Sequence, residues 1–576
     1  MIKYLVEDIN IMERCFIEYT RWKSTALPED LMAELEAIEG DGDEIYDRFC
    51  KDIVFGTSGL RGKMGAGTNR INSVVLRKAS MGIARYLTER YGEPGLVIGF
   101  DTRINSKEYA ASVAEVFAAR GVNAYVFGEA TPVPVVSFAV RHLKLNGGIM
   151  ITASHNTREY NGYKVYDHFG NQIDEDKARL IEKYIKEEDP FEGCGDAGKG
   201  QVFILDDSVK EAYLAEVQKN ILLWDEEANC RKALSELKVC YTPLNGSGLG
   251  YVTRILNSLG AGTVDVVESQ QKPDGNFPTC PSPNPENDGA FTEALKVCAA
   301  NQNKYDVILA TDPDSDRMGA AVLTDEGYCR LSGNQVGELM FDYILRCHSR
   351  GVCGRVLSDG MTAFKSFVSS PLTEEMGRAY GVKVKNVFTG FKNIALAMER
   401  LTASGRGGDF LFGFEESLGY LYGDYTRDKD GIMACQMLCL MAAEQKSQGK
   451  DLVQRLEELY GQYGYTESIT TALVYKQEKD RQRMAAMVKS LFDGKLKECS
   501  ALGKEIKKEF CYRRQSMYCA DLADGCRVIV RPSGTELKLK IYIFAKGATR
   551  EEAIDKAARL CALVRRTLEE EERKNE

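Results

Sequence analysis

Histidine is scarce in this sequence, with only four among 576 residues. Chemistry that depends on several imidazole groups, such as a polyhistidine metal centre, is therefore nearly excluded. The 17 cysteines include no C-x-x-C pair, so neither a disulfide framework nor a zinc module is indicated. An odd number of cysteines fits reduced thiols, and we expect a cytoplasmic protein.

Long apolar runs and a basic excess are also missing. No run is long enough to span a bilayer, and the acidic start MIKYLVEDINIMERCF lacks the apolar core of a signal peptide. We therefore expect no membrane partner. A net charge of −10 argues against a nucleic-acid partner. Because the overall field repels anions, any phosphate site has to be created locally.

The order of apolar and amphipathic segments predicts an α/β protein. A hydrophobic fraction of 44% over this length indicates several globular domains. Strand, helix and strand follow one another three times, which predicts three related mixed or parallel sheets covered by helices. The predicted segments are Leu96–Phe100, Glu108–Ala119 and Ala124–Phe127; Leu237–Tyr241, a helix from Tyr251 and Thr263–Val267; Arg355–Ser358, a helix from Met361 and Val382–Phe388.

The two ends of the chain differ from this pattern. Residues 1–50 read as a helical layer, with Leu31, Leu35 and Ile38 on one face. The last part reads as a small α+β domain with strands, a helix and a charged tail. We predict domains at 1–200, 201–325, 326–460 and 461–576.

A hydroxyl and a cation stand out in the stretch from Gly147 to Lys164. Ile149–Ile151 reads as the end of a buried strand, after which Ser154 lies on a loop at the strand end, where α/β proteins place their chemistry. Lys164 follows a predicted Asn161-Gly162 turn. The alternative, equally open from this stretch alone, is that Ser154 caps a helix and Lys164 is solvated.

Three glycine-containing segments need different interpretations. Phe55–Gly62 permits an open turn in which Arg61 offers a fixed guanidinium to phosphate, although a purely structural turn fits as well. Gly193–Gly198 has the formal pattern G-x-G-x-x-G, but a charged helical run precedes it, so we interpret it as a linker. The letters of the long loop Gln271–Asn287 do not specify its role.

Three carboxylates at alternate positions, Asp312, Asp314 and Asp316, follow a buried strand. Like charges this close repel strongly unless a cation lies among them. An EF-hand is excluded, because Arg317 and Leu323 stand where its glycine and glutamate belong. A solvated acidic turn is the remaining alternative. Three carboxylates leave room for a phosphate oxygen on a magnesium ion, as phosphoryl transfer requires.

Two later loops carry weaker signals. Glu415 with Ser417 could bind sugar hydroxyls, but these residues alone favour an exposed acidic turn. Thr389-Gly390-Phe391-Lys392 lies on another strand-end loop, and Arg427–Gly431 reads as a charged helix start. The loop 531–536 offers a guanidinium, hydroxyls and backbone N–H groups to one anion.

The order of these motifs resembles the α-D-phosphohexomutase superfamily. T-A-S-H-N with Y-N-G-Y-K is followed by D-P-D-S-D-R, G-F-E-E-S and R-P-S-G-T-E, between about Phe55 and Ile543. Length and G-F-E-E-S-L-G-Y are similar to the bacterial phosphoglucomutase branch related to phosphoglucomutase-2 and phosphopentomutase. The resemblance implies four domains around a central cleft, three of them related.

The resemblance also implies roles for individual residues. Ser154 resembles the serine that carries the phosphoryl group, His155 and Lys164 the acid–base groups, and Arg61 accompanies them. Magnesium ligands are implied at Ser154, Asp312, Asp314 and Asp316. Substrate-binding residues are implied at Arg317, Thr389, Gly390, Lys392, Glu415, Ser417, Arg531, Ser533, Gly534 and Thr535.

The implied activity is that of a phosphoglucomutase. Such an enzyme interconverts glucose 1-phosphate and glucose 6-phosphate with Mg²⁺, through a phosphoserine and glucose 1,6-bisphosphate. Leu418-Gly419-Tyr420 stands where many mannose and glucosamine enzymes have histidine, and Asn245 also replaces a histidine of some relatives.

Other activities and the oligomeric state stay open. Phosphopentomutase or phosphomannomutase activity, a sugar-bisphosphate synthase and an inactive sugar-phosphate-binding relative are the alternatives. A serine hydrolase is unsupported, because no G-x-S-x-G surrounds Ser154.

Overall fold

The structure, a computed structural model, describes residues 2–57, 59–193, 200–302, 305–351, 354, 356–475, 480–491, 506–512, 516–533 and 537–574. Three helices open the chain: α1(Ile2–Lys23), α2(Glu29–Ala37) and α3(Gly42–Phe49). Leu31, Leu35 and Ile38 are buried, as their predicted common face requires. Helix α3 begins after Asp41, whose carboxylate accepts the N–H of Glu44. The expected leading helical layer is therefore confirmed.

The first sheet is six-stranded and mixed, in the order β1-β5-β4-β2-β3-β6. Strands β2, β3, β4 and β6 are parallel, whereas β5 runs antiparallel to β4 and β1. Its elements are β1(Leu60–Lys63), α4(Ser73–Thr88), β2(Gly95–Phe100), α5(Ser106–Ala119), β3(Asn123–Phe127), α6(Val133–His142), β4(Gly147–Ile151), β5(Tyr160–Asp167), α7(Glu175–Glu187) and β6(Val202–Leu205).

The second sheet has five strands in the order β11-β10-β9-β7-β8 and is also mixed. Its elements are α8(Ser208–Lys219), α9(Glu227–Ser235), β7(Lys238–Thr242), α10(Leu249–Leu259), β8(Thr263–Val266), α11(Glu268–Gln271), η1(Asp288–Phe291), α12(Thr292–Ala300), β9(Val307–Thr311), β10(Met318–Thr324) and β11(Gly327–Leu331).

The third sheet has four strands in the order β13-β12-β14-β15. Its elements are α13(Gly333–Arg350), β12(Thr362–Ser366), α14(Leu372–Ala379), β13(Lys383–Val387), α15(Phe391–Ala403), η2(Gly407–Asp409), β14(Phe410–Glu415), β15(Gly419–Leu421), α16(Gly431–Ser447) and α17(Leu452–Tyr463). Three mixed-sheet units therefore exist, as predicted.

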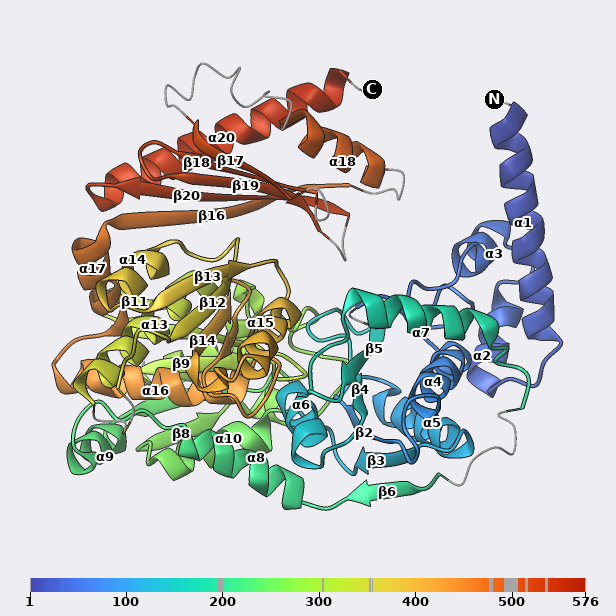
Figure 1. Cartoon of the computed structure of the whole chain (residues 1–576), viewed down its shortest axis with the longest axis horizontal. Coiled ribbons are helices and arrows are strands. Elements are labelled where there is room, and N and C mark those ends of the chain that lie inside the picture. Colours follow the sequence, from blue (N-terminus) through green and yellow to red (C-terminus); the bar gives the residue numbers. More distant parts are fainter. Residues whose placement is uncertain are drawn as a thin grey trace.

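The fourth sheet is antiparallel, in the order β16-β20-β19-β18-β17. In Figure 1 it lies above the third sheet, with α18 and α20 on its far side. Its elements are β16(Tyr465–Val474), α18(Asp480–Ser490), β17(Ile506–Tyr512), β18(Met517–Leu522), β19(Arg527–Pro532), β20(Lys538–Gly547) and α20(Arg550–Lys574). The predicted C-terminal α+β unit is thus confirmed.

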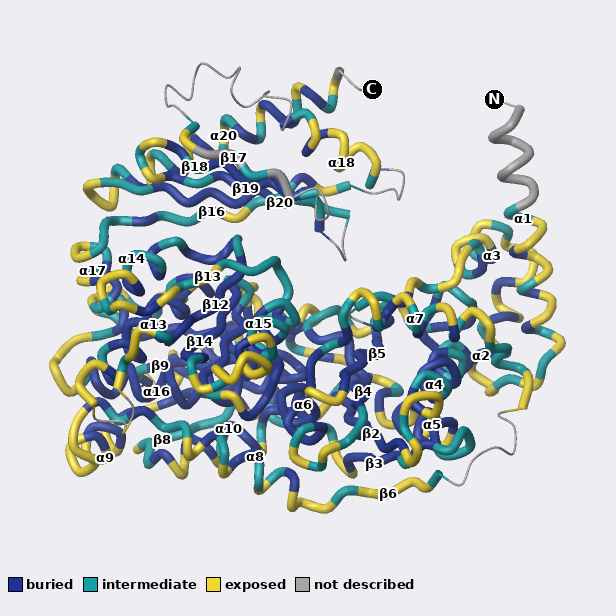
Figure 2. The backbone as a smooth tube through the Cα atoms, in the orientation of Figure 1, coloured by how far each residue is buried: buried dark blue, intermediate teal, exposed yellow. Residues whose placement is uncertain are grey.

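One hydrophobic core runs through the first three units, and α16 lies inside it. Every residue from Gly431 to Gln445 is buried, which Figure 2 shows as continuous dark blue. A helix that is apolar on all sides must be surrounded by other elements. Because this helix contacts elements around both the second and the third sheet, it joins these two units rigidly.

Two local predictions are wrong. Met361 does not start a helix: Thr362–Ser366 is β12, which is buried and parallel to β13 and β14, and the described residues before it, 356–358, form no strand. The apolar spacing of this segment fits a buried helix or a buried strand, because both faces are covered.

Asn161-Gly162 is not a turn but part of β5. Glycine is needed there for close approach. A Cβ on Gly162 would lie 2.4 Å from the carbonyl oxygen of Thr152 and 2.8 Å from that of Leu60. The Asn161 amide meanwhile bonds the Ser106 hydroxyl and the Ile104 carbonyl. Tertiary packing therefore explains a dipeptide that resembles a turn signal.

Candidate active site

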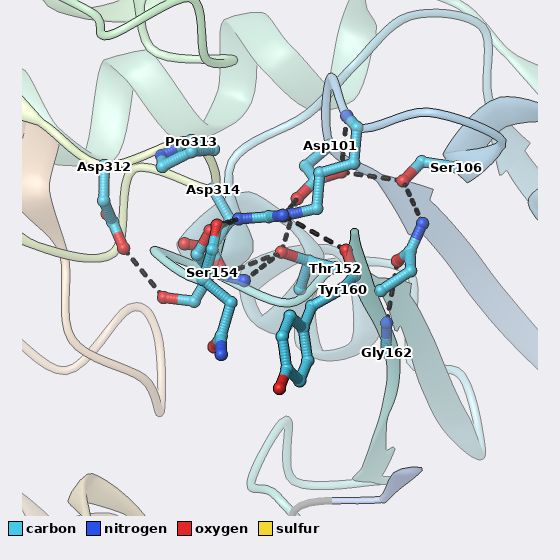
Figure 3. A network of polar contacts seen from close by, with 12 residues as sticks. Asp101, Ser106, Thr152, Ser154, Tyr160, Gly162, Asp312, Pro313 and Asp314 are labelled. Atoms are coloured by element: carbon cyan, nitrogen blue, oxygen red, sulfur yellow. Dashed lines mark hydrogen bonds and ion pairs between the residues drawn. The ribbon is translucent and has the colours of Figure 1, made fainter. Parts of the chain in front are cut away.

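Loops from two different sheets bring Ser154 and the aspartate cluster together. Ser154 follows β4 and Asp312 follows β9, and both strands end at the same site. The Ser154 Oγ donates a hydrogen bond to Asp312 Oδ2 at 2.8 Å, although the two residues are 158 positions apart. Figure 3 shows the two side chains pointing toward each other. Only 3% of Ser154 is exposed, and the residues that follow it form turns and then β5, so Ser154 does not cap a helix.

The backbone of Ser154 is held in a conformation that serine rarely adopts. Its φ is 53°, in the left-handed region. The Ser154 N–H donates to Thr152 Oγ1 at 2.8 Å, and that hydroxyl in turn donates to Asp101 Oδ2 at 2.6 Å (Figure 3). Strain of this kind persists only where the surroundings over-determine it, and it is common at functional sites.

Arg103 holds the loop between β4 and β5, residues 152–159, which carries Ser154 and is called the serine loop below. The sequence did not indicate this role of Arg103. Its Nη2 donates to the carbonyl oxygens of Ser154, at 2.5 Å, and Asn156. Its Nη1 donates to those of Thr157 at 2.9 Å and Tyr160 at 3.1 Å. The only signal in the sequence was its place directly after a buried strand.

The three aspartates form a buried cluster that fits a cation. One carboxylate oxygen from each of Asp312, Asp314 and Asp316 lies within 4.8 Å of the others. Asp314 Oδ1 and Asp316 Oδ1 are buried and have no hydrogen-bond partner among the described residues. Burial and the two neighbouring carboxylates raise the pKa of Asp312 well above its ordinary value. Oxygen donors left unpaired in this way are suitable ligands for a hard divalent cation.

The loop that carries the cluster is clamped by neighbours from all three α/β units. Val133 N–H donates to the Asp314 carbonyl at 2.9 Å, and Ser247 N–H to that of Pro313 at 2.9 Å. Gly431 N–H donates to the Ser315 carbonyl at 3.1 Å. The loop that carries the three aspartates is therefore held by backbone hydrogen bonds from all three units.

Two lysines neutralise part of the cluster. Lys164 Nζ lies 2.9 Å from Asp314 Oδ2 and 3.2 Å from Asp316 Oδ2, and Lys429 Nζ lies 2.8 Å from Asp316 Oδ2. Although burial raises it, the pKa of Asp316 falls because of Lys429 and Lys164. Although burial lowers it, the pKa of Lys164 is raised by Asp314 and Asp316. Lys429 was hidden in a run that we read only as a charged helix start.

His155 and Arg61 lie beside the same loops. Burial, with the positive charges of Arg317 and Arg61, holds the pKa of His155 well below its usual value. The imidazole is therefore neutral at physiological pH and able to accept a proton. Arg61 Nη1 donates to Asn156 Oδ1 at 3.3 Å, so the guanidinium is tied to the serine loop.

Arg317 follows the aspartate cluster and is partly anchored. Its backbone N–H donates to Asp312 Oδ1 at 3.0 Å, and its Nη1 donates to Glu286 Oε1 at 2.6 Å. Glu286 belongs to the long loop whose role the sequence left unspecified. The structure therefore adds a carboxylate to the predicted set.

The third unit contributes loops after β13 and β14. Glu415 is 4% exposed and accepts the Gly390 N–H at 2.6 Å, so the expected exposed acidic turn is wrong. Lys392 donates to Thr57 Oγ1 in the segment that carries Arg61. Thr389 Oγ1 is buried and has no hydrogen-bond partner within the described ranges. Ser417 follows Glu415 at the end of β14 and is half-buried, with no hydrogen bond to the other described site residues.

The fourth unit is described only in part at its loop. Arg531 and Ser533 lie at the end of β19, where the Ser533 N–H donates to the Lys538 carbonyl at 2.8 Å. The Arg531 Nε is buried and makes no hydrogen bond to a residue that the structure describes. Gly534 and Thr535 lie outside the described residues. The anion-binding role predicted for this loop stays a prediction.

Family models cover most of the chain. Those described as phosphoglucomutase/phosphomannomutase alpha/beta/alpha domains I, II and III match residues 52–192, 211–325 and 332–463. The chain is 32% identical over 526 residues to a phosphoglucomutase of Staphylococcus aureus strain bovine RF122, covering 88% of this chain and 92% of that protein. It is 33% identical over 524 residues to the phosphoglucomutase of strain MRSA252, covering 87% and 91%.

Solved structures share the fold. The pp63/parafusin phosphoglucomutase from Paramecium, in an open form, has a TM-score of 0.66 at 17% identity, covering 90% of this chain and 96% of that one. A phosphoglucomutase/phosphomannomutase family protein from Burkholderia thailandensis has a TM-score of 0.65 at 18% identity, covering 89% and 97%. At these identities the likeness supports the fold alone. None of the helices that the structure describes is long and apolar enough to cross a membrane.

Proposed function

Because the chain belongs to the phosphoglucomutase/phosphomannomutase family of phosphohexomutases, we propose that it interconverts glucose 1-phosphate and glucose 6-phosphate through a phosphorylated Ser154. Glucose 1,6-bisphosphate is the intermediate. The observation that carries this proposal is the contact of Ser154 Oγ with Asp312 at 2.8 Å, beside a buried triad of carboxylates. A hydroxyl at a cation site is what reversible phosphoryl transfer needs.

Asp312, Asp314 and Asp316 are the residues that would hold magnesium, with Ser154 beside them. The ion, when bound, offsets negative charge on the moving phosphoryl group. Arg103 and Thr152 meanwhile fix the backbone of Ser154, so that its oxygen keeps one position through the catalytic cycle. Such positioning is the main contribution of a protein to phosphoryl transfer.

Proton transfer is assigned to His155 and Lys164. A sugar hydroxyl that attacks the phosphoserine has to lose its proton. Burial and two arginines lower the pKa of His155, which keeps its imidazole unprotonated and free to act as an acceptor, but also makes it a weaker base. Lys164 stays charged as long as Asp314 and Asp316 dominate its surroundings. Its acid–base role therefore requires that the charge of those carboxylates be offset.

The sugar has to bind in two orientations, one for each phosphate. The bisphosphate reverses its orientation in the site and then returns its other phosphate to Ser154. Arg61 and Arg317 lie near the reacting end, whereas Arg531 and Ser533 begin the loop proposed to bind the distant phosphate. Thr389, Gly390, Lys392, Glu415 and Ser417 are proposed to bind the sugar between them.

Glucose is proposed as the sugar on two grounds. The Staphylococcus aureus relatives at 32 and 33% identity are named phosphoglucomutases. In addition, Leu418-Gly419-Tyr420 lacks the histidine that the sequence analysis associated with mannose and glucosamine substrates.

Phosphorylation of Ser154 tests the mechanism directly. The purified protein is incubated with glucose 1,6-bisphosphate and its peptides are analysed by mass spectrometry. We expect one phosphate on Ser154, and none on the Ser154→Ala variant. Thr157→Ala, which removes an exposed hydroxyl of the same loop, should be labelled like the wild type. Labelling of another residue, with turnover preserved in Ser154→Ala, would refute the proposal.

A further inference from the structure

Arg317 has donor capacity that its neighbours do not use. Glu286 fixes one end of the guanidinium, at 2.6 Å from Nη1. The Arg317 Nε is buried and makes no hydrogen bond in the described part of the chain, although Asp316 Oδ1 lies 3.9 Å away as an ion-pair partner. A buried N–H of this kind is costly to leave unpaired, which indicates that a ligand completes its environment.

Glu286 is itself held in place. Its N–H donates to Asn284 Oδ1 at 3.0 Å. Pro285 packs closely on β10, where a Cβ on Gly319 would lie 2.8 Å from the Pro285 Cβ. The carboxylate is therefore presented from a fixed backbone and does not reach out from a free loop.

One carboxylate oxygen of Glu286 remains available. Its Oε1 bonds Arg317, whereas its Oε2 makes no hydrogen bond to a residue that the structure describes. The side chain is 40% exposed. A carboxylate oxygen accepts two hydrogen bonds, so a hydroxyl next to Arg317 would find an acceptor in Glu286.

The charge of Glu286 also affects the pKa values of two groups in the third and fourth units. Burial raises the pKa of Glu416 to about 7, and the carboxylates of Glu415 and Glu286 add to the effect. Burial likewise raises the pKa of Tyr542 on β20, with contributions from Glu416 and Glu286. Glu286 is thus close enough to Glu416 and Tyr542 to affect their ionisation.

We propose that Glu286 determines sugar specificity, an inference that rests on the proposed function. Its Oε1 holds Arg317 in position, and its Oε2 accepts a hydrogen bond from one hydroxyl of the bound sugar phosphate. A site built to bond a hydroxyl discriminates against an analogue that lacks it, because the acceptor then loses the partner that the ligand supplied. Glu286 is a specificity residue in this account and takes no part in moving a proton.

The test is an equilibrium titration that needs no turnover. The Ser154→Ala protein, with and without Glu286→Ala, is titrated calorimetrically with glucose 6-phosphate and its 2-, 3- and 4-deoxy analogues. We expect Glu286→Ala to weaken glucose 6-phosphate binding by roughly ten- to a hundredfold, as for a hydrogen bond to a charged group. For one deoxy analogue the same substitution should change affinity by less than about threefold.

Control variants distinguish a direct hydrogen bond between Glu286 and the sugar from an indirect effect of Glu286 on the structure of the site. Asp288→Asn breaks another carboxylate–arginine pair at the end of the same loop, 3.0 Å from Arg330, and should leave all affinities unchanged. Glu286→Asp should recover part of the loss for glucose 6-phosphate. Equal losses for every analogue would overturn the proposal, since Glu286 would then act only by positioning Arg317. No loss at all would overturn it as well.

Failure of the proposed function would be seen separately. In that case the unmutated protein would not convert glucose 1-phosphate, while the titrations would still report on Glu286. The same comparison with mannose 6-phosphate and its 3- and 4-deoxy analogues, and with ribose 5-phosphate and its 2- and 3-deoxy analogues, covers the other sugars. Loss of sensitivity to Glu286→Ala in one deoxy form only is the supporting result for whichever sugar binds.

Discussion

Replacement of Arg103 by lysine should disable the serine loop while leaving the fold intact. The guanidinium donates to four carbonyl oxygens, those of Ser154, Asn156, Thr157 and Tyr160. Its two terminal nitrogens each serve two of them. A lysine has one nitrogen and no planar fork, so it cannot span the same set.

The expected loss of kcat can be estimated from the carbonyl groups that lose their hydrogen-bond donor. If lysine serves two of the four, two buried carbonyls lose their donor, at about 1–3 kcal/mol each. The left-handed backbone of Ser154, which is unfavourable by about 1–2 kcal/mol, then has less to hold it. The loop should relax, and a loss of about 4 kcal/mol in positioning, the middle of the range of about 2–6 kcal/mol for two carbonyls, corresponds to roughly a thousandfold in kcat.

The assay is steady-state conversion of glucose 1-phosphate, together with the thermal midpoint. We expect kcat of Arg103→Lys to fall by at least about a hundredfold, with only a small change in the melting temperature. Arg120→Lys changes a partly exposed guanidinium of the same unit, which pairs with Glu188 at 2.8 Å, and should retain activity. A kcat of Arg103→Lys within threefold of the wild type would refute the reasoning.

Three further variants test other parts of the structure. Gly162→Ala should destabilise the protein by about 1–3 kcal/mol, because a Cβ would collide with two backbone carbonyls. Gly92→Ala is its control, because a Cβ there meets nothing within 4 Å. Equal melting temperatures of the two variants would contradict the packing argument. Burial raises the pKa of Glu338 from its ordinary value near 4.5 to about 7, so its ionisation opposes folding as the pH rises through this range. Glu338→Gln should therefore gain up to about 3 kcal/mol over the wild type above pH 7 and nothing below about pH 4.5, and a pH-independent difference in melting temperature would be inconsistent with this. Lys429→Met removes a positive charge 2.8 Å from Asp316 and should tighten Mg²⁺ binding by up to about tenfold in calorimetry; weaker binding would show that the lysine helps to form the site.

The sequence could predict the site because its groups follow the ends of buried strands. Ser154 follows β4, Asp312 follows β9 and Glu415 ends β14. Strand-end loops of α/β sheets are where such proteins bind ligands. Patterns with a strong local signal, such as alternate aspartates after an apolar run, therefore identified residues that the structure brings together, whereas their roles stay predictions.

What the sequence could not predict depends on tertiary environment. Lys429 looks like a solvated charge in its local context, yet it is buried against Asp316 because α16 lies in the core. Arg103 carries no local mark of the four carbonyls that it binds. Gly162 resembles half of a turn, because a need for close approach and a need for positive φ select the same residue. The segment from Met361 fits helix or strand equally well until its neighbours are known.

Conversion of glucose 1-phosphate tests the central claim most directly. The full chain is assayed with Mg²⁺ and a trace of glucose 1,6-bisphosphate, and glucose 6-phosphate is measured as it forms. Our account predicts rapid turnover that stops when the metal is chelated and resumes when Mg²⁺ is restored. Absence of turnover, in protein whose Ser154 carries phosphate, would contradict the assignment of glucose as the substrate.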